Sequence, residues 1–240
     1  MIPKVIHYCW FGRGEMPALV QTCIQSWHTH MPTWEFKLWS EDNFDMDAAP
    51  LYVQQAYAAK KYAFVSDYVR LWALEREGGL YMDVDFEVYK PFDELMEQYS
   101  AFAGYEGSKK NPIMMGVLAA EAHHPWVQGM MATYADRRFV KENGTYDMTP
   151  NTGYFYDWMT NQGFVGDGVE KDWMGVHILP VECFCPGLTT GENVRSERTY
   201  CEHKGLHSWS GTGGWKVQLL NCFAPSLKIK LIKLKRILLG

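Results

Sequence analysis

Two aspartates, Asp83 and Asp85, stand one residue apart in the stretch GGLYMDVDF (residues 78–86), which otherwise has the pattern of a buried strand. Carboxylates are costly to bury unless a partner offsets their charge. On a strand, side chains two residues apart share a face, so both carboxylates would point together, with their Cα atoms about 7 Å apart. Two like charges at this range favour a cation between them. Mg²⁺ or Mn²⁺ combines a few carboxylates with water and phosphate oxygens, so the pair is a candidate clamp for a metal and a diphosphate.

The DxD pattern alone also fits three other kinds of site. An EF-hand calcium loop is excluded because Val88 stands where such a loop needs glycine. A glycosidase carboxylate pair usually comes from two strands rather than one, which makes that reading weak. A haloacid-dehalogenase-like phosphatase remains as the less favoured alternative. Its later acidic motif is similar to GDGVEKD, with Asp167 and Asp172, although Glu87 departs from the residue usual after its DxD.

The elements that must position the aspartates alternate between strand-like and helix-like stretches. Their order predicts an α/β fold with a mainly parallel sheet flanked by helices, in which ligands collect at the carboxyl ends of the strands. We expect strands over residues 4–10, 34–40, 80–88, 100–105, 113–120 and 175–181. We expect helices over residues 18–30, 51–61, 62–79, 125–139 and 153–161, and a short helix opened by Pro91.

Charge is distributed unevenly along the chain. Six of the 23 Lys and Arg residues lie in the last 25 positions and no acidic residue follows Glu202, so residues 1–215 carry 17 basic against 28 acidic side chains. This acidic body argues against nucleic acid as a partner. The segment 216–240 is basic, and its leucines recur at helical spacing, as in helices that lie on an anionic membrane surface. A terminal element packed on its own domain is an equal alternative.

Composition restricts the compartment and the kind of ligand. The 47% hydrophobic and 21% charged content is typical of a globular chain, and the 15% aromatic content suits a site that stacks sugars or flat rings. Six cysteines without a regular framework indicate reduced thiols, and no stretch reads as a membrane span or a signal peptide. We therefore expect a cytoplasmic protein. A zinc site is also conceivable but fits no standard spacing; its ligands would be Cys183, Cys185, Cys201 and His203.

The surroundings of the DxD motif are more specific than the motif. SDYVR (66–70) precedes it and places Asp67 and Arg70 on one helical face. Together with IPKVIHYCWFG near the start, the stretch SDYVRLWALEREGGLYMDVDFEVYKPFDEL resembles the DXD sugar-binding region of glycosyltransferase family 32. The resemblance covers residues 1–95 and returns at HKGLHSW (203–209). It implies a GT-A type α/β fold and a single catalytic domain over residues 1–215. Residues 1–95 would form the nucleotide-sugar and metal half and 96–215 the acceptor half, followed by the basic amphipathic tail 216–240.

The resemblance also implies roles for individual donor-site residues. Trp10 would stack on the nucleobase of the donor. Asp67 and Arg70 would hold the donor sugar and its phosphate side, for which the planar guanidinium of Arg70 is suited. Tyr81 would contact the donor near the sugar, and Asp83 would bind ribose or sugar hydroxyls.

The same resemblance assigns the metal. Asp85 would be the principal ligand of Mn²⁺ or Mg²⁺, with Asp83 sharing the ion. His207 would be a further ligand, with His203 as second choice. In the same C-terminal element, Ser208 and Trp209 would lie near the diphosphate.

The expected activity follows from these roles. Asp83, Asp85 and Arg70 would be the catalytic residues of a retaining, metal-dependent hexosyltransferase that uses a UDP- or GDP-sugar. The acceptor would be a saccharide or a lipid-linked saccharide, contacted by the segment TPNTGYFYDW (149–158), in capsular or other surface polysaccharide synthesis. The protein would act in the cytoplasm or peripherally at the membrane. A non-catalytic protein that only binds nucleotide sugars is the alternative.

Overall fold

The computed structural model describes residues 1–107, 113–186 and 195–205. The chain divides into two compact units, Met1–Lys204 and Gly205–Gly240, and the second lies outside the described residues apart from Gly205. In chain order the elements are β1 (Val5–Cys9), α1 (Ala18–His30), β2 (Glu35–Trp39), α2 (Leu51–Ala58), α3 (Tyr62–Glu77), β3 (Gly79–Met82), β4 (Phe86–Val88), α4 (Asp93–Gln98), β5 (Ala101–Tyr105), β6 (Ile113–Ala120), α5 (Pro125–Ala132), α6 (Asn151–Asn161), β7 (Lys171–Trp173), β8 (Val176–Leu179), the 3₁₀ turn η1 (Val181–Cys183) and β9 (Cys201–His203).

Seven strands form the central sheet, in the order β2-β1-β3-β6-β5-β8-β7. The pairings β1–β2, β1–β3 and β5–β8 are parallel, whereas β6 and β7 run antiparallel to their neighbours. Five strands therefore point in one direction and two in the other. The predicted α/β fold with a mainly parallel sheet is confirmed.

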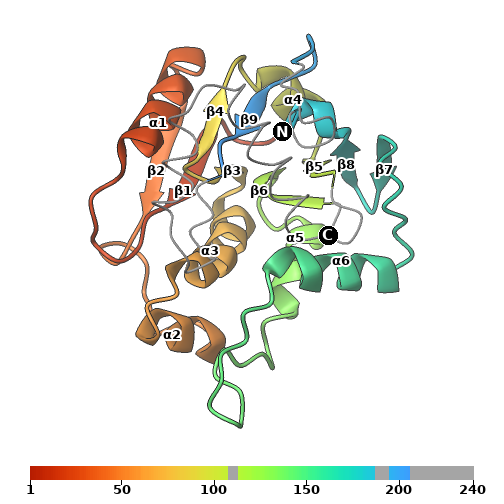
Figure 1. Cartoon of the computed structure of the whole chain (residues 1–240). Coiled ribbons are helices and arrows are strands. Elements are labelled where there is room, and N and C mark those ends of the chain that lie inside the picture. The colour runs from red at the N-terminus through yellow and green to blue at the C-terminus, as the bar shows by residue number, and fades with distance from the viewer. Residues whose placement is uncertain (108–112, 187–194, 206–240) are drawn as a thin grey trace, which may run out of the picture. The chain divides into compact units, whose positions relative to one another are not determined.

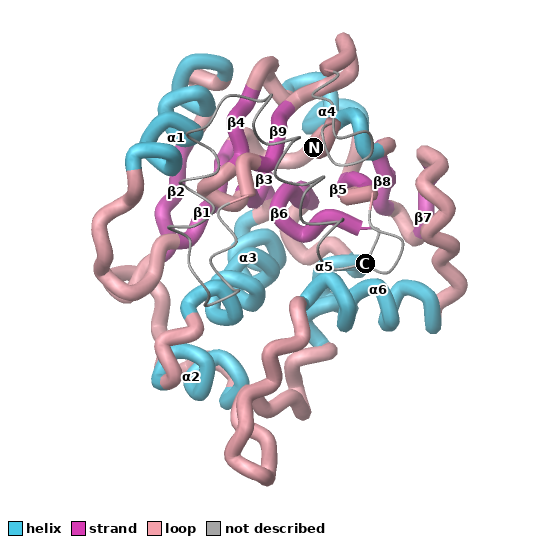
Figure 2. Tube along the Cα trace, viewed as in Figure 1, coloured by secondary structure: helices cyan, strands magenta, loops and turns pink. Residues whose placement is uncertain are grey.

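Helices cover both faces of this sheet (Figure 1). One face packs on apolar side chains of α2, α3, α5 and α6, such as Val65 and Phe155. The other face packs on α1, on α4 and on a second, two-stranded sheet made of β4 and β9. Figure 2 shows the strands enclosed between these helices. Both faces are buried, which explains why the central strands β3, β5 and β6 read as continuous apolar runs.

The stretch around the aspartates is where the structure departs most from the predicted elements. The single strand expected over residues 80–88 is instead two strands, because β4 leaves the central sheet and pairs with β9. Asp83, Val84 and Asp85 lie in the turn between them, so the strand geometry that we assumed for the two aspartates is wrong. The strands β7 and β9 were not predicted, and α5 ends at Ala132, shorter than expected.

The junction before β3 explains why the chain turns sharply there. Helix α3 ends at a glycine pair, and Gly78 and Gly79 both have positive φ. The amide of Gly78 donates to the carbonyl of Leu74 at 2.9 Å. His7 on β1 ties this corner to the sheet, since its Nε2 lies 2.8 Å from the Gly78 carbonyl and its Nδ1 accepts from the Trp39 indole at 3.1 Å. The turn therefore places β3 directly beside β1.

In the described ranges no helix has both the length and the apolar character that crossing a bilayer requires. The tail 216–240, and with it the predicted domain boundary after residue 215, lies outside the described residues. Association of the tail with a membrane surface stays a prediction.

Gly116 on β6 provides a test of the packing at the end of β3. A Cβ atom there would lie 2.7 Å from the ring of Phe86 and 2.9 Å from Oδ2 of Asp83. We expect Gly116→Ala to lower the free energy of unfolding by about 1–3 kcal/mol, because the added methyl overpacks the turn. Urea denaturation measures this change. Gly14→Ala is the control, since its methyl meets no atom within 4 Å, and equal midpoints for both variants would contradict the packing described.

Candidate active site at the carboxyl ends of β1 and β3

The carboxyl ends of two adjacent parallel strands bring the predicted site residues together. Ile6 and His7 of β1 pair with Leu80 and Tyr81 of β3, so the residues that follow each strand leave the sheet at the same edge. Trp10 follows β1 directly. Its amide donates to the Trp39 carbonyl at 2.9 Å, and its indole donates to the Gly14 carbonyl at 2.6 Å. The indole is thus fixed in the loop after β1, and its stacking on a nucleobase stays a prediction.

Arg70 is the centre of the polar network at this edge. Its side chain is 6% exposed. Its Nη2 lies 2.7 Å from Oδ1 of Asp67, one helical turn earlier on α3, and 3.3 Å from Oδ1 of Asp83. Its Nη1 donates to the carbonyl of Met115 on β6, and its carbon Cζ lies 4.7 Å from the centre of the Tyr81 ring. One guanidinium therefore joins α3, β6 and the turn after β3.

Asp83 is held by Tyr81 as well as by Arg70. The Tyr81 hydroxyl donates to Oδ1 of Asp83 at 2.7 Å, and the Asp83 amide continues the ladder by donating to the Gly116 carbonyl at 2.8 Å. Burial raises the pKa of Asp83 above its usual value, and the charge of Asp85 raises it further, while Arg70 lowers it. About a third of the Asp83 side chain remains exposed, at 32%. Its position is therefore fixed, and it can still meet a ligand.

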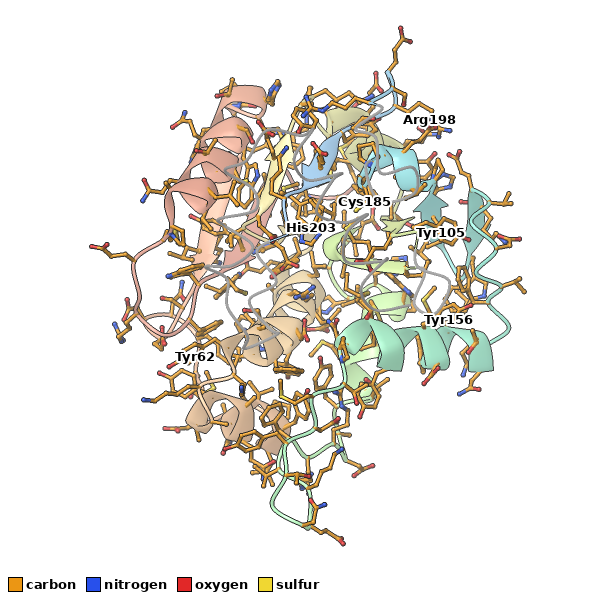
Figure 3. All side chains as sticks on the ribbon, viewed as in Figure 1. Tyr62, Tyr105, Tyr156, Cys185, Arg198 and His203 are labelled. Atoms are coloured by element: carbon orange, nitrogen blue, oxygen red, sulfur yellow. The ribbon has the colours of Figure 1, made fainter. Side chains whose placement is uncertain are left out.

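Asp85 is held by a different part of the chain. Its Oδ2 lies 3.0 Å from Nε2 of His203 on β9, and its carbonyl accepts from the Lys204 amide at 2.8 Å. The His203 ring stacks on Phe86 with ring centres 4.8 Å apart. Burial opposes a charged imidazole, yet the hydrogen bond to Asp85 raises the pKa of His203 above its usual value. The structure thus brings the second-choice histidine, which is labelled in Figure 3, into contact with Asp85 of the DxD turn.

The pairing of β4 with β9 is reinforced by a partly buried ion-pair network. Lys204 lies 2.7 Å from Glu87 and 2.9 Å from Glu202, and the Tyr89 hydroxyl lies 2.8 Å from an oxygen of Glu87 and 2.7 Å from one of Glu202. Burial raises the pKa of Glu87, but the bonds to Lys204 and Tyr89 lower it below its usual value overall. These contacts hold the chain near residue 203 against the DxD turn. The predicted residues His207, Ser208 and Trp209 lie outside the described residues, and their roles stay predictions.

One acidic side chain at this edge was missed by the sequence reasoning. Glu106 follows β5, and burial raises its pKa above the usual value, while the charge of His203 lowers it and that of Asp83 raises it. The position of Glu106 after the last residue of a predicted strand was the only signal that could have drawn attention to it. It adds a third carboxylate to the electrostatic surroundings of the DxD turn.

A divalent cation fits the two DxD carboxylates chemically. Asp83 and Asp85 supply hard oxygen ligands, and the charge of Asp85 raises the pKa of Asp83, a repulsion that a cation between them would relieve. Across the described ranges no group of three or more His, Cys, Asp or Glu side chains is arranged to hold a metal. A cation at the aspartates would therefore take its other ligands from phosphate oxygens, water or residues beyond these ranges.

The structure does not bring together the residues of the phosphatase alternative, and it disfavours the zinc site. Asp172 lies on β7, four strands from β3, which at about 4.8 Å per strand is roughly 19 Å. Asp167 pairs with Lys171 at 2.6 Å, and Asp172 lies on the edge strand β7, so the second acidic residue of the phosphatase alternative is far from the DxD turn. Cys183, Cys185 and Cys201 are buried free thiols, and burial raises the pKa of Cys183 to about 11, which disfavours the thiolate that zinc requires.

The segment predicted to contact the acceptor, residues 149–158, meets the site at Asp67. Helix α6 begins at Asn151, and its backbone amide faces the Asp67 carboxylate. Burial raises the pKa of Asp67 to about 6, whereas Arg70, Arg137 and the Asn151 amide lower it. Asp67 therefore connects α3 to the N-terminus of α6. This helix lies outside the two stretches, 1–95 and 203–209, that carry the sequence resemblance.

Arg70→Lys tests the network directly. Lysine keeps the charge but cannot bridge Asp67, Asp83 and the Met115 carbonyl at once, so we expect the free energy of unfolding to fall by about 2 kcal/mol. Chemical denaturation measures the fall. Arg76→Lys on the same helix is the matched control, because Arg76 is exposed, lies 4.9 Å from the Trp72 ring centre and makes no ion pair with a described residue. Equal losses for the two variants would show that Arg70 has no special role.

The chain is similar in structure to several glycosyltransferases of known structure. Among curated proteins no sequence matches the chain. Mouse xyloside xylosyltransferase 1 superposes with a TM-score of 0.50 at 7% identity, covering 87% of this chain and 99% of that one. The PaToxG glycosyltransferase has a TM-score of 0.46 at 17% identity, covering 68% and 69%. The galactosyltransferase LgtC has 0.45 at 12% identity, covering 89% and 94%.

These likenesses concern the fold, and the predicted GT-A type architecture is confirmed. The sequence of residues 17–102 matches the family described as the glycosyltransferase sugar-binding region containing a DXD motif. This range includes Asp67, Arg70, Tyr81, Asp83 and Asp85. The resemblance stated from the sequence is confirmed. The chain is a glycosyltransferase, and its residues 17–102 belong to the DXD-containing sugar-binding family.

Proposed function

We propose that this glycosyltransferase transfers a sugar from a nucleotide-sugar donor to a saccharide acceptor and depends on Mn²⁺ or Mg²⁺. The observation that carries the proposal is the joint placement of two anchored aspartates at one sheet edge. Asp83 is fixed by Arg70 and Tyr81, and Asp85 is fixed beside His203. Fixed carboxylates of this kind hold a metal–diphosphate without reorganising when the donor arrives.

Each residue of the network would bind a different part of the donor. Asp85 and Asp83 would hold the cation, and the cation, when bound, supplies positive charge to the departing diphosphate. Asp67 would accept hydrogen bonds from hydroxyls of the transferred sugar. Arg70 is largely occupied by protein acceptors, so its main contribution is to orient Asp67 and Asp83 while its charge favours the anionic leaving group. Trp10, Ser208 and Trp209 would complete the donor site.

The finer features of the reaction rest on the family resemblance. Retention of the anomeric configuration, a UDP or GDP nucleotide and a role in surface polysaccharide synthesis are proposed on that ground. An oxygen of the acceptor would attack the anomeric carbon as the bond to the diphosphate breaks, and the proton of the acceptor hydroxyl would leave with the nucleotide or with water. The acceptor would approach from α6 and the loops beyond β5.

Asp85→Asn tests the metal and donor roles together. The amide keeps the shape but loses the charge, so we expect kcat/KM for transfer or donor hydrolysis to fall at least about 100-fold, equivalent to ~2.7 kcal/mol. Excess EDTA should abolish turnover by the wild type, and Mn²⁺ or Mg²⁺ should restore it. Product formation from UDP-glucose, UDP-galactose, UDP-N-acetylglucosamine and GDP-mannose is followed by mass spectrometry.

Asp172→Asn is the matched control, because this carboxylate is 81% exposed on β7 and far from the turn. It should retain wild-type rates. Full turnover in EDTA would contradict the metal role. Thermal protection of the wild type by a nucleotide sugar without any product would instead identify a non-catalytic binding protein.

A further inference from the structure

The loop that carries Trp10, residues 10–14, turns sharply after β1. Gly12 and Arg13 have consecutive positive φ values of 96° and 56°. A residue with a side chain seldom adopts this backbone conformation, so surrounding contacts must hold Arg13 in it. A Cβ atom at Gly12 would overlap the Tyr62 ring, which means that the loop backbone lies directly against the start of α3. The loop therefore has one particular conformation that its neighbours maintain.

Glu41, in the loop after β2, binds this turn with its carboxylate. Its Oε1 accepts from the Gly12 amide at 2.6 Å and from the Tyr57 hydroxyl on α2 at 3.2 Å. The Glu41 side chain is half-buried. Hydrogen bonds to an ionised acceptor are stronger than those between neutral groups. One carboxylate oxygen therefore joins the loop after β1, the loop after β2 and helix α2.

The loop after β2 is rigid enough to hold Glu41 in place. Asn43 closes it with both ends of its amide, because Oδ1 accepts from the Ser40 amide at 2.9 Å and Nδ2 donates to the Leu38 carbonyl at 2.7 Å. Strands β1 and β2 pair in parallel along their whole length, so the two loops leave the sheet side by side at its carboxyl edge. Glu41 is thus a fixed support for the loop that follows β1.

The orientation of the Trp10 ring depends on the same loop. Its indole nitrogen donates to the Gly14 carbonyl at 2.6 Å, and that carbonyl lies two residues beyond Gly12. The Trp10 side chain is half-buried, so part of its ring is open to a ligand. The direction of the Gly14 carbonyl follows from the turn at Gly12 and Arg13. A contact that fixes the turn therefore also fixes the indole.

We propose that Glu41 is a positioning residue that, through the Gly12 amide, orients the indole of Trp10 for stacking on the nucleobase of the donor. The proposal rests on the proposed function, in which Trp10 belongs to the donor site. A base stacked on an aromatic ring gains roughly 10- to 100-fold in affinity, and the gain requires a correctly placed ring. Glu41 would raise the affinity for the nucleotide only through Trp10.

A double-mutant cycle tests this dependence. Glu41→Ala removes the acceptor of the Gly12 amide, so we expect the affinity for UDP or GDP, whichever the wild type binds better, to fall about 10-fold. Trp10→Ala should cost at least as much. When Trp10 is already alanine, Glu41→Ala should change the affinity by less than about 2-fold, because the ring through which it acts is gone. Isothermal titration with Mn²⁺ present measures all four affinities.

Three further variants keep the test decisive. Glu41→Gln retains an acceptor oxygen for the Gly12 amide and should stay within about 3-fold of the wild type. Asp42→Asn is the matched control and should leave the affinity unchanged. Asp42 pairs with Arg13 of the same loop at 2.8 Å, but the two side chains are 72% and 65% exposed, and exposed ion pairs contribute little. If Glu41→Ala does not fold, Glu41→Asp, which is one methylene shorter, replaces it with the same expectation.

The outcomes separate this inference from the proposed function. Undiminished affinity in folded Glu41→Ala, or an equal loss with and without Trp10, would overturn the positioning role alone. A loss for Asp42→Asn as large as that for Glu41→Ala would overturn it as well. A wild type that binds neither UDP nor GDP, with or without Mn²⁺, would overturn the proposed function on which it rests.

Discussion

A buried guanidinium is costly unless acceptors offset its charge, and Arg70 determines the arrangement of this site through its need for acceptors. Its acceptors come from three places: Asp67 on its own helix, the Met115 carbonyl on β6, and Asp83 in the turn after β3. Because these groups belong to separate elements, α3, β6 and the turn must keep fixed relative positions for the charge to be satisfied. The aspartates of the DxD motif are thus oriented by the fold before any ligand arrives.

Segments outside the family-matched range complete the site. His203 on β9 reaches Asp85 across 118 residues of sequence, and the ion pairs of Lys204 hold that strand against β4. On the other side of the network, the Asp67 carboxylate meets the backbone amide of Asn151 at the start of α6. The DXD region therefore supplies the groups that would contact metal and donor, while later parts of the chain fix the orientation of those groups.

The elements around the motif could be predicted where local signals were strong. Helical spacing and a glycine pair indicated α3 correctly, and parallel pairing of the strands led to the carboxyl edge that Trp10 and Asp83 share. The break between β3 and β4 could not be predicted, because β4 is defined by its pairing with β9 far along the chain. For the same reason the contact of His203 with Asp85 could not be predicted. Tyr134 and Arg137 belong to no motif, whereas Asn151 lies in the segment predicted to contact the acceptor. Within the described part of the chain, all three have buried polar side-chain atoms without a hydrogen-bond partner.

The central claim is that the DxD turn binds a metal–diphosphate with Asp85 as the principal ligand. Anomalous diffraction at the manganese edge, from crystals grown with Mn²⁺ and the UDP or GDP of the preferred donor, tests it most directly. The account predicts one strong peak in contact with a carboxylate oxygen of Asp85 and with diphosphate oxygens. Nucleotide density at the sheet edge without a peak at Asp85, or a peak elsewhere with the nucleotide, would contradict it.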